Sequence, residues 1–186
     1  GTEDDAVAAA EQLGYPVVVK ADAAGLAHRT EAGGVRLDVR DAAAVRVACY
    51  QLRARAGAER FVVQEQVPAG VELLVGARRD ESFGPVVAVG AGGILTEVIR
   101  DVSFRLAPLD EGEAQEMLRA GARARLLDGP RGLPRVDAAA VARTVDAVAA
   151  LVIAEPHVLE IDVNPLIAAG SDVVAVDAVV IVGEPA

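Results

Sequence analysis

Aromatic residues are scarce in this sequence of 186 residues. They make up 3% of the chain, and tryptophan is absent. Proteins that stack successive bases need aromatic platforms, so this scarcity argues against such nucleic-acid binding. Positive charge is also limited, because 18 Lys and Arg face 28 Asp and Glu and leave a formal net charge of -10. No basic stripe offsets that charge, so we expect no nucleic-acid binding.

Cysteine, long apolar runs and a leader sequence are the other absences. Cys49 is the only cysteine, which excludes a disulfide framework. No apolar run is long enough to span a bilayer, and no signal peptide opens the chain. The sequence begins at Gly1 rather than Met, so we expect an excised domain or a processed chain. Together these features favour a cytoplasmic protein without membrane contact.

The residues that are present predict a mixed fold. Hydrophobic residues, mostly Ala and Val, make up 53% of the sequence and can form a core. Sequence patterns predict strands at 15–20, 35–39, 61–63, 71–77, 86–90, 102–106 and 159–167, and helices that begin near Thr2, Asp41, Asp110 and Asp137. This order predicts an α+β fold with helices flanking sheets. A hinge at 64–71 would separate an N-terminal lobe, 1–66, from a C-terminal lobe, 67–186.

The most informative stretch lies late in the sequence. Between residues 159 and 164, apolar residues alternate with Glu160, Asp162 and Asn164, which indicates a strand with one apolar and one polar face. Turn residues follow, and a second apolar run is interrupted by Asp177. A strand–turn–strand unit would bring Asp177 back beside Asp162 and Asn164.

This oxygen-rich face has two interpretations. It is a solvent-exposed acidic strand, or it is a site for a hard cation such as Mg²⁺, which prefers oxygen ligands. Asp177 favours the second interpretation, because an ionised group inside a Val-rich strand is unfavourable unless it is paired or bound to metal.

Other polar residues suggest contacts with a nucleotide, each with an ordinary alternative. Lys20 ends an apolar strand and can direct its charge at phosphate oxygens, or it is a surface lysine. Gln64 and Glu65 leave a strand edge whose backbone groups can read an adenine edge, and Glu72 can accept hydrogen bonds from a ribose. The alternative is that these residues lie on the solvent-exposed face of a strand and bind no ligand.

Two further features could act on phosphate. The glycine-rich turn at 90–93 can approach phosphate oxygens through its N–H groups. Arg105 lies on the polar side of the strand at 102–106 and can clamp phosphate, with Asp101 as a candidate partner for nearby arginines. His28 lies in a loop of small residues and is either a nucleophile that accepts a phosphoryl group or an exposed histidine without a role.

Taken in order, these segments resemble a known family. The matching stretches are 14–20, 28–35, 63–65, 70–73, 83–86, 92–94, 101–106, 160–166 and 176–178. The set resembles the ATP-grasp domain of ADP-forming acyl-CoA synthetases and covers nearly the whole chain. Related domains form the beta subunit of succinyl-CoA synthetase and are fused to acetyltransferase domains in some bacterial lysine acetyltransferases. The resemblance implies two α+β lobes with a nucleotide cleft between them, and ATP or ADP with Mg²⁺ as cofactors.

The resemblance also implies roles for residues that bind the nucleotide. Lys20 would contact the phosphates, the segment with Gln64, Glu65 and Val67 would meet adenine, and Glu72 would bind the ribose.

For metal binding and catalysis, the implied residues lie in other parts of the chain. Asn164 and Asp177, with Asp162 nearby, would hold Mg²⁺. Arg105 would lie near the transferred phosphate, and His28 would be the second phosphohistidine of a relay.

The sequence departs from the family around His28. Residues 23–27 stand where the family usually has Ser-Pro-Asp, while Arg29 and Glu31 replace the usual Lys and Asp and keep the charge pattern. No CoA-binding domain is present, so the expected partner is a CoA-binding domain or alpha subunit. Two alternatives stay open: a regulatory or assembly module of a lysine acetyltransferase, and an ATP-grasp ligase that joins a carboxylate to an amine.

Overall fold

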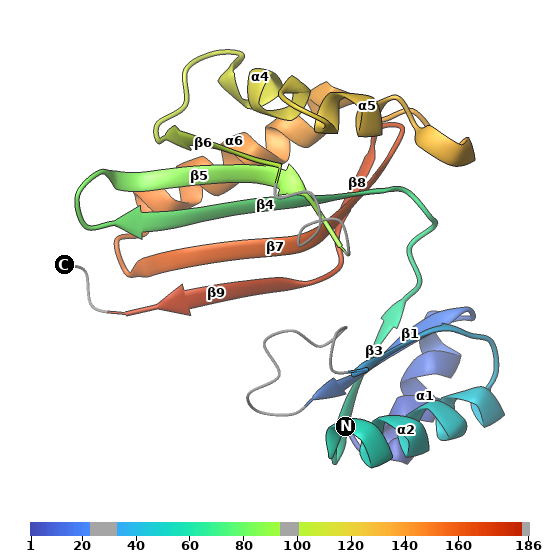
Figure 1. The fold of residues 1–186 in the computed structure, drawn as a ribbon. Coiled ribbons are helices and arrows are strands. Elements are labelled where there is room, and N and C mark those ends of the chain that lie inside the picture. The colour runs from blue at the N-terminus through green and yellow to red at the C-terminus, as the bar shows by residue number, and fades with distance from the viewer. Residues whose placement is uncertain (23–32, 94–100, 184–186) are drawn as a thin grey trace. The chain divides into compact units, whose positions relative to one another are not determined.

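The chain is built from two compact units, Gly1–Gln66 and Val67–Ala186. The computed structural model describes residues 1–22, 33–93 and 101–183 and is drawn as a ribbon in Figure 1. Each unit combines helices with an antiparallel sheet, which confirms the predicted α+β class. Among the described residues, no helix is both long and apolar enough to cross a membrane.

The first unit packs two helices against a three-stranded sheet. Its elements are α1 (Glu3–Leu13), β1 (Val17–Asp22), β2 (Val35–Val39), α2 (Ala42–Ala56) and β3 (Arg60–Glu65). The strand order is β2-β1-β3, and both pairings are antiparallel. Alternate residues of β1 enter the core with Cys49 and Leu52 of α2, and the strand order places β1 at the centre of the sheet.

Both helices of the first unit begin where the sequence predicts. The Thr2 hydroxyl accepts a hydrogen bond from the Asp5 N–H while the Asp5 carboxylate accepts one from the Thr2 N–H, which is a complete capping box. The Asp41 carboxylate accepts from the Ala44 N–H at 2.7 Å. Gly57, in the left-handed conformation, ends α2.

The second unit is larger and places its helices on one face of a sheet (Figure 1). Its elements are β4 (Val71–Asp80), β5 (Gly84–Ala91), β6 (Val102–Leu106), α4 (Glu113–Arg119), α5 (Arg123–Leu127), the 3₁₀ turn η1 (Pro130–Gly132), α6 (Ala138–Ala154), β7 (Val158–Ala169), β8 (Asp172–Ala175) and β9 (Ala178–Val182). The strand order is β6-β5-β4-β7-β8, and β9 pairs with the first half of β7. β7 therefore pairs with three strands and lies inside the sheet.

One face of this sheet forms the core of the unit. Leu73 and Val75 of β4 and Val163 of β7 pack against Val141 and Val145 of α6. Alternate residues of the same strands point to the opposite face, which carries Glu72, Asp162 and Asn164. We call this second face the open face, because the helices of the unit lie on the other side.

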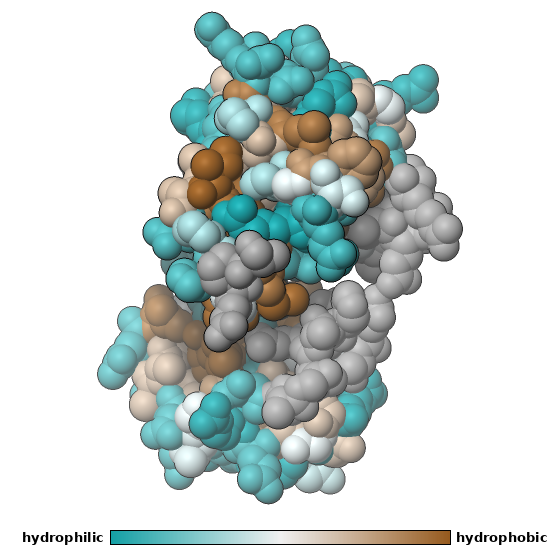
Figure 2. Space-filling view, turned by 90° about the vertical axis from the view of Figure 1, so that its left-hand side faces the viewer, coloured by the Kyte–Doolittle hydropathy of each residue, from teal (hydrophilic) through white to brown (hydrophobic). Residues whose placement is uncertain are grey.

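In the edge strand β6 the apolar side faces away from the helices, whereas the apolar side of an alternating strand usually faces the core. Phe104 is opposite Ala88 of β5, which is opposite Gly76 and then Asp162 across the sheet, so the apolar side of β6 belongs to the open face. Phe104 and Leu106 are exposed there. Figure 2 shows that hydrophobic residues, in brown, lie at the surface of the molecule among hydrophilic ones. The polar side of β6 instead faces the helices.

Candidate functional site

The candidate site is a cluster on the open face where the end of β5 meets β4. The Gly92 N–H donates to the Glu72 carbonyl oxygen at 2.9 Å. A Cβ at Gly93 would lie 1.6 Å from Oε2 of Glu72, so the Glu72 carboxylate rests directly against the Gly93 backbone. A Cβ at Gly92 would lie 2.5 Å from the Leu73 backbone. Only glycine fits at position 92, where the obstacle is backbone, whereas a side chain at position 93 would displace the Glu72 carboxylate.

Asn164 and Asp177 complete this cluster. The Gly93 N–H donates to Oδ1 of Asn164 at 3.2 Å, which fixes the amide orientation. The Asn164 N–H donates to the carbonyl oxygen of Asp177 at 3.2 Å, because Asp177 lies at the junction of β8 and β9 and both strands pair with β7. The structure therefore has Asp177 beside Asn164, as the sequence predicts. We refer to Glu72, Gly93, Asn164 and Asp177 as the oxygen cluster.

Asp162 lies on the same face as the oxygen cluster, two residues before Asn164. It is opposite Gly76 of β4 on one side and Val179 of β9 on the other. In the described part of the chain, no group of three or more His, Cys, Asp or Glu side chains is arranged to hold a metal. The oxygen atoms on this face belong to the Asn164 amide and to the carboxylates of Glu72, Asp162 and Asp177, and the contact between Asn164 and Asp177 is made by backbone atoms. Mg²⁺ accepts such a set when water and phosphate oxygens fill the remaining positions.

The glycine-rich turn has a different role from the one predicted. Its N–H groups were expected to approach phosphate, but those of Gly92 and Gly93 donate to Glu72 and Asn164. The physical reason is the close approach of β4 and β7 to the end of β5, which supplies acceptors within the protein. The turn therefore orients Asn164.

Arg105 is not brought to the oxygen cluster. It is opposite the buried Val87 of β5, which places it on the helix-covered face of the sheet, and its Nε lies 3.4 Å from Oε1 of Glu113 in α4. The alternation of β6 alone does not reveal which of its two sides faces the helices. In the structure the polar side faces them.

In the first unit, Lys20 is almost completely buried, at 6% exposed. It lies between Val35 of β2 and Val62 of β3. The residues before and after it belong to the helical core, so the Lys20 side chain leaves β1 on the opposite face. A lysine is rarely buried to this extent unless it is paired, and the alternative of a surface lysine is wrong.

The segment expected to meet adenine follows β3. Gln64 is opposite Val18 and shares the face of Lys20, whereas Glu65 is opposite Val17. Both side chains are exposed. The Gln66 N–H donates to the Pro16 carbonyl oxygen at 3.4 Å. Val67 is half-buried and is the first residue of the second unit.

His28, predicted as the phosphoryl acceptor, lies outside the described residues, as do Arg29 and Glu31. Asp101 was a candidate partner for Arg100 or Arg105. Among the described residues it forms its ion pair with Arg123 of α5 rather than with Arg105, at 3.0 Å between Oδ1 and Nη1, and Arg100 lies outside the described residues. Sequence reasoning missed Arg123, because it lies between Arg119 and Arg125 in a Gly- and Ala-rich segment and no local pattern marks which of the three arginines is buried.

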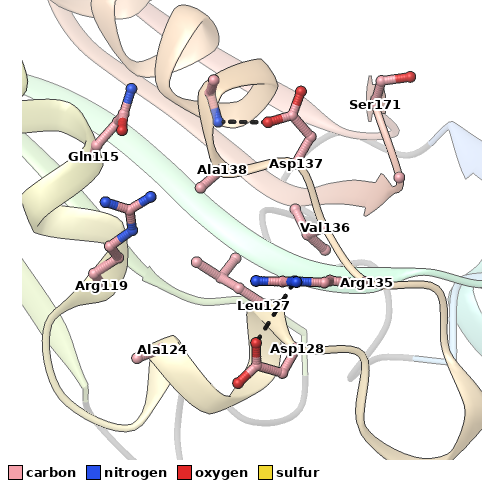
Figure 3. A pocket seen from close by; sticks show the side chains of 12 residues that line it. Gln115, Arg119, Ala124, Leu127, Asp128, Arg135, Val136, Asp137, Ala138 and Ser171 are labelled. Carbon is pink, nitrogen blue, oxygen red and sulfur yellow. Dashed lines mark hydrogen bonds and ion pairs between the residues drawn. The ribbon is translucent and has the colours of Figure 1, made fainter.

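A cavity of about 680 Å³ lies elsewhere in the second unit, at the N-terminus of α6. Figure 3 shows Arg135 beside Asp128, and Arg119 and Asp137 elsewhere on the lining. The two positive charges are balanced by two carboxylates, and Asp137 already caps α6 through the Ala139 N–H at 2.9 Å. The cavity contains none of the predicted site residues, so we place the candidate site at the oxygen cluster.

Comparison with known proteins adds independent evidence. A family model described as "ATP-grasp domain" matches residues 1–182. The ADP-forming acetate–CoA ligase I of Archaeoglobus fulgidus is 38% identical over 97% of this chain, which corresponds to 27% of that protein. The beta subunit of the ADP-forming acetate–CoA ligase I of Pyrococcus furiosus is 35% identical over 95% of this chain and 79% of the subunit.

A solved structure has the same fold. It is the dinucleotide forming acetyl-coenzyme A synthetase 1 of Ca. Korarchaeum cryptofilum in complex with coenzyme A and Mg-AMPPCP, with its phosphohistidine segment pointing towards the nucleotide binding site. The TM-score is 0.82 at 35% identity, over 97% of this chain and 82% of that chain. The chain spans about a quarter of the length of the first relatives it matches, at 27%. The match to the family model over nearly its whole length shows that this chain belongs to the ATP-grasp family.

Proposed function

We propose that this chain is the nucleotide-binding part of an NDP-forming acyl-CoA synthetase, in which it transfers a phosphoryl group between a phosphohistidine and ADP. The overall reaction would convert acyl-CoA, ADP and phosphate into carboxylate, ATP and CoA. The observation that carries the proposal is the oxygen cluster, in which Gly93 contacts the Glu72 carboxylate and donates to the Asn164 side chain, while the Asn164 backbone N–H donates to the Asp177 carbonyl oxygen. The relatives that bear ADP-forming ligase names support it.

The residues of the cluster fit a hard cation. Asn164 and Asp177 are adjacent and half-buried, and Asp162 lies on the same face. In the proposal Asn164 and Asp177 hold Mg²⁺, with Asp162 nearby. When bound, the ion neutralises negative charge on the phosphates during transfer. Because the protein provides few ligands, metal binding should depend on the nucleotide.

The remaining nucleotide contacts are assigned to both units. Lys20 provides a positive charge for the phosphates, and its buried position in β1 limits its conformational freedom. Gln64, Glu65 and Val67 belong to the segment that meets adenine, and Glu72 accepts hydrogen bonds from the ribose. Arg105 is left out, because its pairing with Glu113 and its face of the sheet favour a structural role.

His28 is assigned as the residue that carries the phosphoryl group to ADP. An imidazole nitrogen accepts the group from a donor on the CoA-binding partner, and an oxygen of the ADP β-phosphate then displaces the imidazole. A CoA-binding domain or alpha subunit is the proposed partner, in agreement with the relatives named as beta subunits. The acyl-CoA chemistry belongs to that partner, and the complex is expected to be cytoplasmic.

Isothermal titration tests the metal site. We expect ADP to bind more tightly in Mg²⁺ than in EDTA, and Asp177→Ala to remove this difference. Asp172→Ala is the matched control, because Asp172 is an exposed carboxylate at the start of β8, on the same hairpin. The site assignment fails if ADP binds independently of both Mg²⁺ and Asp177.

The phosphoryl-transfer step needs a second experiment. The chain is mixed with a CoA-binding partner and ATP labelled at the γ-phosphate, and acid-labile label on histidine is measured. We expect label on the chain that is lost in His28→Ala. ADP binding without labelling would favour a regulatory module, and full turnover by His28→Ala would favour a ligase that joins a carboxylate to an amine.

A further inference from the structure

Arg123 is a completely buried arginine at the start of α5. Its Nη1 donates to Oδ1 and to the carbonyl oxygen of Asp101, and its Nη2 donates to the Ser103 hydroxyl and, at 2.9 Å, to the Met117 carbonyl oxygen. Its Nε has no hydrogen-bond partner among the residues that the structure describes. One guanidinium thus joins α4 and α5 to the beginning of β6.

The carboxylate of Asp101 is enclosed from several sides. Its Oδ2 accepts a hydrogen bond from the backbone N–H of Arg123 at 2.9 Å. Gly121, with a φ of 62°, lies so close that a Cβ there would be 2.5 Å from Oδ1. Burial lowers the pKa of Arg123, and the Asp101 carboxylate opposes this effect. The arginine stays charged at neutral pH because its ordinary pKa is far above 7. The pair is therefore a fixed ionic anchor.

This anchor lies at the end of the β5–β6 ladder from which the glycine-rich turn begins. The last pair of that ladder is Gly90 with Val102, and a Cβ at Gly90 would lie 3.4 Å from the Asp101 carbonyl oxygen, the same oxygen that Arg123 binds. Three residues beyond Gly90, the Gly93 N–H donates to Asn164. The strand end held by Arg123 therefore leads directly to the residue that orients Asn164.

We propose that Arg123 is a positioning residue for the oxygen cluster: by fixing Asp101 it holds the end of β5, so that Gly93 keeps Asn164 turned toward its ligand. The functional meaning rests on the proposed metal-dependent nucleotide binding. The positional effect does not, because it exists in the protein without metal or nucleotide. The two parts can therefore be tested separately.

Hydrogen exchange followed by NMR, on the protein without ligand, tests the positional effect. Arg123→Lys keeps the positive charge but loses the fork that reaches Ser103 and Met117 together. We expect it to speed exchange of the Gly93 amide by about tenfold, because the bond to Asn164 opens more often. The amide of Val75, inside β4, should keep its wild-type rate. A purely structural role would speed both amides together, and an unchanged Gly93 rate in folded Arg123→Lys would overturn the proposal.

Two further variants keep the test decisive. Arg125→Met is the matched control, because Arg125 is exposed and lies two residues along α5, and it should leave Gly93 unchanged. If Arg123→Lys does not fold, Ser103→Ala removes one acceptor while the ion pair remains, and we expect about threefold faster Gly93 exchange. Wild-type exchange in Ser103→Ala would then refute the positioning role.

Nucleotide binding provides the second readout. Titration of ADP in Mg²⁺ and in EDTA should show a smaller gain from Mg²⁺ in Arg123→Lys than in the wild type or Arg125→Met. If the wild type itself gains nothing from Mg²⁺, the proposed function fails, while the exchange rates still decide the role of Arg123. If the wild type gains affinity and Arg123→Lys gains as much, the positioning role fails and the proposed function stands.

Discussion

Replacing Gly93 by alanine perturbs the oxygen cluster at its most crowded point. The new Cβ would lie 1.6 Å from Oε2 of Glu72, and the backbone φ of 60° is one that side chains other than glycine rarely adopt. The obstructing atom is the end of a flexible side chain, so Glu72 can rotate away. We therefore expect a folded protein with a displaced Glu72 carboxylate.

The destabilisation has two parts of different origin. A left-handed conformation with a Cβ costs about 1–2 kcal/mol. Forcing Glu72 away from its present rotamer adds about 0.5–1.5 kcal/mol. We expect Gly93→Ala to lower the free energy of unfolding by roughly 1.5–3.5 kcal/mol, the sum of the two.

A matched glycine separates these parts. Gly170 has a φ of 61°, and nothing lies within 4 Å of a Cβ built there, so Gly170→Ala carries the backbone strain without the contact. We expect about 1–2 kcal/mol for it. In a Glu72→Ala background, Gly93→Ala should be no more destabilising than Gly170→Ala.

Urea unfolding of the four variants and the wild type gives the free energies, and ADP titration gives the functional effect. The Glu72→Ala and Gly93→Ala substitutions should weaken ADP binding to similar extents, because both remove the carboxylate from its position. The reasoning is refuted if Gly93→Ala is equally destabilising with and without Glu72, since the two substitutions would then be additive and the contact without consequence.

The remaining predictions concern other parts of the chain. Burial, followed by the charge of Glu3, raises the pKa of Cys49 to about 11 from an ordinary 9.0, so a thiol reagent at pH 8 should react only after unfolding. Between these two pKa values the unfolded thiol loses its proton first, so raising the pH from about 9 to about 11 should lower stability relative to Cys49→Ala, as measured by urea midpoints. Asp137→Ala removes the cap of α6 and should cost about 1 kcal/mol in the same assay. Lys20→Met should weaken ADP binding in titration and leave AMP binding less affected, and equal losses for both nucleotides would argue against a phosphate contact.

Local chemistry made most elements predictable from the sequence. The capping residues Thr2, Asp41 and Asp137 act within a few residues of their position, and each begins a helix as expected. The proximity of Asn164 and Asp177 was also predictable, because the chain turns after β7 and runs back along it, which brings Asp177 beside Asn164.

What could not be predicted depends on contacts between distant segments. The alternation in β6 gives two sides but not the direction of each, which is decided by helix α4 and by the pairing with β5. Arg123 is buried because Asp101 and Met117 provide acceptors around it, and no local pattern marks that. The glycine-rich turn was a candidate for a phosphate contact, since the sequence does not reveal that the N–H groups of Gly92 and Gly93 donate to Glu72 and Asn164.

The position of β7 has a consequence for how this protein forms. β7 is made late in the chain, yet it lies between β4 and β9 in the interior of the sheet. Until β7 pairs with β4, one edge of β4 has no partner strand. Glu72 is then on β4 without Asn164 and Asp177 beside it. If the oxygen cluster binds the nucleotide as proposed, the sheet closes and the binding site forms in the same step, so a chain that lacks β7 should show no nucleotide binding rather than weaker binding.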